Sequence, residues 1–132
     1  MLKIAAISLL TIDVLAMLSM YTFKTIKGYY PFKMFNSLYK LGTACKCKVS
    51  DENIYAASAK GENGTAIMIS YFTDDDTCTE TIKLNLDFVG GAESYEAFLL
   101  DNNHDAESVG IIENGSCIDM EPNTVLLFES LQ

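Results

Sequence analysis

The residues with the clearest potential for chemistry are a histidine and two neighbouring acids. His104 lies between Asp101 and Asp105, and a histidine paired with an aspartate is a common form of general base. No serine or cysteine is placed to act as its nucleophile, and the segment Asp101-Asn102-Asn103 is typical of a turn. We therefore interpret His104 as a surface histidine whose hydrogen bonds are satisfied by its neighbours.

The candidate metal ligands are the run Asp74-Asp75-Asp76 and the pair Cys45 and Cys47. Consecutive aspartates point in different directions, and the spaced ligands, glycine and terminal glutamate of a calcium loop are missing. The two cysteines are expected on one face of one strand, where they can hardly bond each other. A single histidine and no second cysteine pair leave no zinc-binding pattern. We expect a solvated acidic turn, reduced structural thiols, no metal and no cofactor.

Carboxylates are abundant, with 18 aspartate and glutamate residues, and any two could in principle form a glycosidase pair. Such a pair must rise from a rigid, concave site, which strand-edge carboxylates of a small domain rarely form. The sequence therefore predicts no catalytic residue.

Length and charge indicate one globular domain. The chain has 132 residues, 49% hydrophobic, which is enough for a single core. Its net charge of −9 repels nucleic-acid phosphates and anionic membrane surfaces, so nucleic acid is not an expected partner. The sequons at Asn63 and Asn114 are also plain turn sequences and do not establish secretion.

Residues 1–23 permit three interpretations. A secretory signal fits the apolar run after Lys3, but no small-residue cleavage site is evident. A membrane anchor is interrupted by Asp13, a charge that costs about 3 kcal/mol at mid-bilayer. A helix packed on protein fits the apolar residues at three- and four-residue steps. We favour the packed helix, and localisation stays open: the cytoplasm is slightly preferred over secretion or membrane tethering.

Periodicity predicts one well-marked helix followed by strands. Pro31 suits a first helical turn and Gly42 a C-terminal stop, which gives a helix over 31–41 with Met34, Phe35, Leu38 and Leu41 on one side. After Gly42 the period falls to two. The predicted strands are 44–49, 53–60, 65–72, 79–88, 94–101, 107–112, 116–120 and 123–129.

The strand pattern predicts the fold class. In 79–88 four apolar residues alternate with polar ones, as in a half-buried antiparallel strand. The strands 53–60 and 65–72 should form a hairpin whose loop carries Asn63-Gly64. We predict a mainly β fold: an antiparallel β-sandwich of about eight strands over residues 43–132, preceded by one or two helices within residues 1–42.

Aromatic residues gather around the predicted helix: Tyr29, Tyr30, Phe32, Phe35 and Tyr39. We expect them to form an interface, with another domain or by self-association in a homodimer or larger assembly. A different platform, for stacking on sugar rings, would use Tyr55, Tyr71 and Tyr95. Tyrosines in strands are more often half-buried in sheet packing.

Several of these segments resemble a known family. Gly28-Tyr29-Tyr30-Pro31-Phe32 through Asn36-Ser37-Leu38-Tyr39-Lys40-Leu41-Gly42 resembles the last barrel helix of clan A glycoside hydrolases of the β-xylosidase and α-L-iduronidase type, family 39-like. Residues 53–60 and 65–72 are similar to strands of the β-sandwich that follows this barrel. The likeness continues through 98–105 and 121–128, covers about residues 21–130, and rests on structural motifs.

The resemblance implies part of an enzyme. Family members hydrolyse glycosidic bonds with retention, using two glutamates on a barrel, one of them in an Asn-Glu pair. A barrel needs about 250 residues, whereas only about forty precede the sandwich. The Asn-Glu pair is also missing, since Glu113-Asn114 has the two residues in the opposite order. The resemblance thus implies a truncated, non-catalytic accessory sandwich that braces a catalytic barrel, with 1–42 as a barrel remnant. The alternatives are a small carbohydrate-binding module and an exported or membrane-tethered sandwich.

Overall fold

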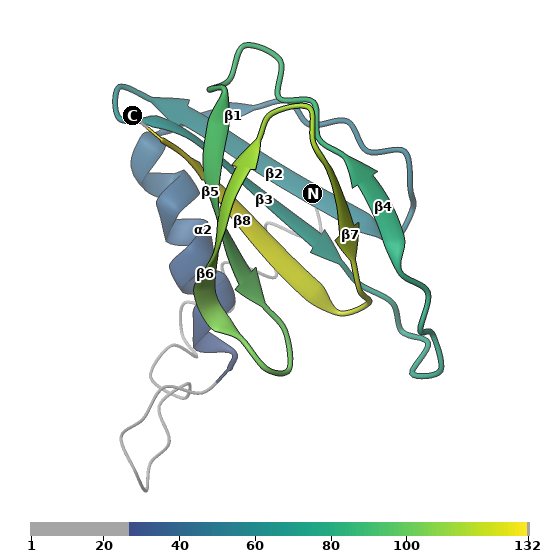
Figure 1. The fold of residues 1–132 in the computed structure, drawn as a ribbon. Helices are drawn as coiled ribbons and strands as arrows, with labels where there is room; N and C mark the ends of the chain where they lie inside the picture. Colours follow the sequence, from purple (N-terminus) through teal and green to yellow (C-terminus); the bar gives the residue numbers. More distant parts are fainter. Residues whose placement is uncertain (1–26, 132) are drawn as a thin grey trace, which may run out of the picture.

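The structure, a computed structural model, describes residues 27–131 (Figure 1). In chain order its elements are α2 (Tyr29–Leu41), β1 (Thr43–Cys45), β2 (Ile54–Gly61), β3 (Gly64–Tyr71), β4 (Ile82–Asn85), β5 (Ser94–Leu100), β6 (Asp105–Glu113), β7 (Cys117–Met120) and β8 (Thr124–Ser130). The prediction of a mainly β fold, with eight antiparallel strands after a helix, is confirmed. The expectations for residues 1–23 lie outside the described residues.

The strands form two antiparallel sheets. The larger sheet has the order β1-β2-β3-β8-β5-β6, and the smaller one consists of β4 and β7. The helix α2 covers one face of the large sheet, and β4 and β7 cover the other (Figure 1). The large sheet is therefore the middle of three layers, and its central strands must be apolar on both faces.

The strand β8 shows how the core is divided. Leu126 and Phe128 lie in the cluster between the two sheets, whereas Leu127, between them in sequence, lies in the cluster under α2. The ring of Phe128 is fully buried, and its centroid lies 5.7 Å from that of Phe88. Side chains that alternate along one strand thus anchor both outer layers.

Local signals place the helix and the first hairpin as predicted. Pro31 lies in the first turn of α2, where its missing N–H costs nothing. Gly42 follows the helix with φ +86°, a conformation that favours glycine. In the β2–β3 hairpin Gly61 pairs with Gly64, so Glu62 and Asn63 form the loop.

Two strands are shorter than predicted. β1 ends at Cys45, because it pairs only with β2 and the chain then leaves the sheet for the turn that starts β2. Cys47 lies beyond β1, so the prediction that both cysteines share one strand is wrong; its Sγ lies 3.1 Å from Ser58 Oγ. β4 ends at Asn85, and beyond it the chain bonds to the turn that precedes β7, while the alternation of buried and exposed residues continues.

The side chain of Asn114 fixes this turn. Its Nδ2 donates to the carbonyls of Phe88 at 3.0 Å and Ala92 at 3.2 Å, and its Oδ1 accepts from the Phe88 N–H at 2.9 Å. Asn114 therefore satisfies three backbone groups of the loop between β4 and β5. This sequon asparagine has a structural role, since its amide nitrogen is already bonded twice.

Candidate docking surface

The helix α2 carries two apolar stripes. Tyr30, Met34, Leu38 and Leu41 recur at steps of four, four and three residues, and all four pack in the cluster between α2 and the sheet. Met34 and Leu38 are buried there. This stripe is the contact that holds the helix on the sheet.

A second stripe, here called the outer face, consists of Phe32, Phe35 and Tyr39. Their steps of three and four residues place them on one side of α2, and none belongs to the cluster under the helix. The Tyr39 side chain is 77% exposed, whereas Phe32 and Phe35 are half-buried. The outer face is thus the part of the predicted aromatic interface that the described sheet does not use.

The other two predicted interface residues lie at the start of α2. Tyr30 packs toward the sheet, and its ring meets that of Tyr29 edge-on at 5.6 Å. The prediction grouped all five aromatics on one face, while the structure separates Tyr30 from the outer face. Helical spacing alone could have made this separation, because Tyr30 is four residues before Met34.

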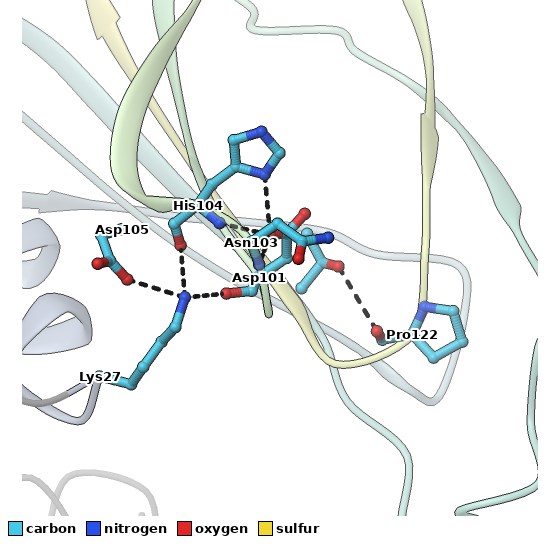
Figure 2. A network of polar contacts seen from close by, with 7 residues as sticks. Lys27, Asp101, Asn103, His104, Asp105 and Pro122 are labelled. Atoms are coloured by element: carbon cyan, nitrogen blue, oxygen red, sulfur yellow. Dashed lines mark hydrogen bonds and ion pairs between the residues drawn. The ribbon is translucent and has the colours of Figure 1, made fainter.

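Lys27 fixes the N-terminal end of α2 on the sheet (Figure 2). Its Nζ lies 2.6 Å from the Asp101 carbonyl, 3.2 Å from the His104 carbonyl and 2.8 Å from Asp105 Oδ1. Both charged side chains of the ion pair are about half exposed, so the pair itself contributes little, at most about 1 kcal/mol. The carbonyl contacts nevertheless direct the helix toward the turn between β5 and β6.

That turn explains the histidine singled out in the sequence. Asp101 Oδ1 accepts hydrogen bonds from the N–H groups of Asn103 and His104, and lies 2.8 Å from His104 Nδ1 (Figure 2). The prediction that neighbouring residues satisfy His104 is confirmed. The Asp101–His104 pair closes the turn between β5 and β6. The backbone carbonyls of the same two residues bind Lys27, just before α2.

With asparagine in place of Asp101, the free energy of unfolding is expected to fall less steeply as the pH is lowered. Burial by itself would raise the pKa of Asp101, but hydrogen bonds from Asn103 and His104 and the charge of His104 lower it. A carboxylate with a lowered folded-state pKa stabilises the fold above its unfolded pKa of about 4, and this contribution disappears as the pH falls through the folded value. Urea titrations from about pH 5 to pH 2 measure the difference.

The exposed Asp119 of β7 provides the control for this experiment. Asp119→Asn makes the same change of side chain at an exposed site, and Asp101→Asn should show a shallower slope of stability against pH than this control. Identical slopes for all three proteins would contradict the role assigned to Asp101.

The described surface has one small cavity and one larger hollow that is open to solvent. One cavity of about 100 Å³ lies between α2 and the sheet, next to Glu129. It has room for about three water molecules, at about 30 Å³ each. Glu96 is the cross-strand partner of Glu129, and its Oε1 accepts from Ser108 Oγ at 2.6 Å. The larger hollow, of about 620 Å³, is lined by Asp87, Glu93 and Glu113 beside Asn114. Carboxylates thus gather in a hollow large enough for a sugar, but this hollow is open to solvent and not enclosed.

Two further findings concern residues 27–131 alone. No cluster of three or more potential metal ligands occurs among them. None of their helices has the length and hydrophobicity needed to cross a bilayer.

The structure rules out the tyrosine platform. Tyr71 and Tyr95 are 3% and 1% exposed and lie in the cluster between the sheets, while Tyr55 is at the surface of β2. The hydrogen bond with Cys78 and burial raise the pKa of Tyr71 to about 12. Burial likewise raises the pKa of Tyr95, whose hydroxyl accepts from the Ala92 N–H at 2.9 Å. Alternation along the strands turns these rings inward, so they cannot stack on a polysaccharide.

Charge is distributed very unevenly along the chain, a feature that the net charge conceals. Residues 27–48 contain five lysines and no acidic residue, whereas residues 49–132 contain two lysines and seventeen acidic residues. Lys33 and Lys40 are exposed on α2 and, seven residues apart, lie on one flank of the helix between the outer face and the sheet; Lys33 also lines the small cavity next to Glu129. The outer face is therefore aromatic, with positive charge on one flank, on an otherwise acidic domain.

Comparison with known proteins agrees with the fold. No protein-family model matches the chain, and no curated protein matches it in sequence. A GH30 endoxylanase from Clostridium papyrosolvens has a similar structure, with a TM-score of 0.70 over 87% of this chain, at 16% sequence identity. The chain spans 30% of the length of that enzyme. The likeness thus shows that the chain has the fold of a part of that endoxylanase, and it does not point to family 39 in particular.

Proposed function

We propose that this chain is a non-catalytic accessory β-sandwich of a glycoside hydrolase, which braces a catalytic barrel through the outer face of α2. The observation that carries the proposal is the division of α2 into two apolar faces, of which the described sheet uses one. Supporting it, the structural likeness covers the smaller part of an endoxylanase. The unmatched larger part of such an enzyme is the kind of partner that the outer face suits.

A bracing helix must itself be held firmly, and α2 is fixed at both ends. Lys27 binds the turn between β5 and β6 at one end. At the other end Gly61 of β2 lies so close to the helix that an added Cβ would collide with the Leu41 carbonyl oxygen. The residues of the outer face are thereby presented on a rigid element, which favours a stable interface.

The first test is an assay for glycoside hydrolysis. The purified chain is expected to release no product from aryl β-xyloside, aryl β-glucoside or aryl α-L-arabinofuranoside, because the acids of the larger hollow lie open to solvent and not in an enclosed pocket. Glu93→Gln and Glu113→Gln in this hollow, and the pair Glu96→Gln and Glu129→Gln, serve as controls and should also release no product. Turnover that disappears in any of these variants would show a catalytic carboxylate and contradict the proposal.

A further inference from the structure

The outer face of α2 and the rest of the domain are electrically complementary. The segment that contains α2 has five lysines and no acid, and the sandwich beyond it has fifteen more acidic residues than lysines. Among the described ion pairs Lys27 engages Asp105, whereas Lys33 and Lys40 take part in none. Two exposed lysines that take part in no described ion pair thus lie on the flank of α2 beside the partly exposed outer face.

We infer that copies of this chain associate head to tail, with the outer face of α2 in one copy against the acidic sandwich of the next. The inference rests on the docking role that the proposed function gives the outer face, and it names a second copy as the occupant of this face where no catalytic barrel covers it. The aromatic side chains supply the apolar contact, and Lys33 and Lys40 supply the attraction to carboxylates.

A symmetric contact of helix against helix fits the charges less well. It would place Lys33 and Lys40 of both copies in one interface, where like charges repel. It would also leave the acidic surfaces of both sandwiches without compensation. The head-to-tail arrangement instead joins surfaces of opposite charge, so that the charges of the two surfaces neutralise each other.

The arrangement has a signature in solution. A symmetric contact closes after two copies, whereas a head-to-tail contact leaves a free face at each end and continues. The average mass should therefore keep rising with concentration, beyond twice the 14.6 kDa of one chain. Sedimentation velocity over a wide concentration range distinguishes the two.

Salt and charge reversal test the electrostatic part. Raising sodium chloride from about 0.05 M to 0.5 M is expected to weaken association about tenfold, because the Debye length becomes much shorter than the reach of the lysines. The double variant Lys33→Glu/Lys40→Glu should lose about tenfold or more at low salt. The matched control is Lys60→Glu/Lys83→Glu, which makes the same change in net charge on exposed lysines of the sandwich and should lose much less.

A mixing experiment tests the polarity. Fluorescently labelled Phe32→Ser/Tyr39→Ser keeps its acidic sandwich, so excess unlabelled wild type should capture it through the intact outer face of α2. A symmetric contact would leave the labelled variant monomeric, since one of its two helix faces lacks the aromatic side chains. That outcome would overturn the inference.

Other results would also overturn it and assign the outer face differently. One is association that is unchanged by salt and by the lysine substitutions but lost in Phe32→Ser/Tyr39→Ser. The outer face would then dock through its aromatic residues alone, and the acidic sandwich would not be its partner. A wild type that stays monomeric yet binds phosphatidylserine vesicles at low salt would assign the face to an anionic lipid surface. The hydrolysis assay is independent of all these outcomes, so failure of this inference and failure of the proposed function are distinguishable.

Discussion

Replacing Phe128 by alanine is expected to lower the free energy of unfolding by about 3–5 kcal/mol. The ring is 0% exposed and lies in β8, which pairs with β3 on one side and β5 on the other. Its removal takes apolar surface out of the cluster between the sheets and leaves a cavity next to Phe88. The strands on both sides limit collapse around that cavity, so little of the loss can be recovered.

Urea unfolding, followed by far-ultraviolet circular dichroism at neutral pH, measures this effect. The control is Ile111→Ala on the edge strand β6, where the side chain is 67% exposed and the cost should stay near or below about 0.5 kcal/mol. A domain of this size has a total stability of about 5–15 kcal/mol. Phe128→Ala should therefore unfold at far lower urea, and similar midpoints for the two variants would show that the core is placed wrongly.

The layered fold could be predicted from local sequence because period-two patterns are local. Ile82, Leu84, Leu86 and Phe88 alternate with polar residues, and all four are packed toward the core although only part of the segment is a strand. Gly42 ends the helix by its own backbone conformation. Signals of this kind depend only on neighbours in sequence, and they located one helix and eight strands.

The order of the strands could not be predicted in the same way. β8 lies between β3 and β5, so its partners come from segments far away along the chain. No local pattern specifies such pairing, which is decided by the packing of complete faces. The early end of β1 has the same cause, because a strand at the sheet edge extends only as far as its single partner and the next turn allow.

The candidate docking surface was only partly predictable. The cluster of aromatic residues is evident, and helical spacing separates Tyr30 from Phe32, Phe35 and Tyr39. Which of the two faces meets the sheet, however, depends on what lies beneath the helix. The net charge conceals the lysines of α2, because a total of −9 sums a basic segment and an acidic one. Counting charge by segment reveals them.

The two faces of α2 should respond to substitution in opposite ways. Met34→Ala is expected to cost about 2–5 kcal/mol of stability, because this side chain is buried between the helix and the sheet. Tyr39→Ala should change stability by less than about 0.5 kcal/mol, because its ring lies largely in solvent and alanine favours the helix. Urea unfolding of both variants gives the comparison.

The same pair separates a docking surface from a core. If the outer face exists to meet a partner, Tyr39→Ala should keep the wild-type unfolding midpoint and lose self-association, while Met34→Ala should lose stability first. Asn36→Ala, at an exposed polar position of the same helix, controls for the change to alanine and should leave both properties intact. A large loss of stability in Tyr39→Ala would mean that this ring belongs to the core of the chain, and the outer face could then no longer serve as a brace for another domain.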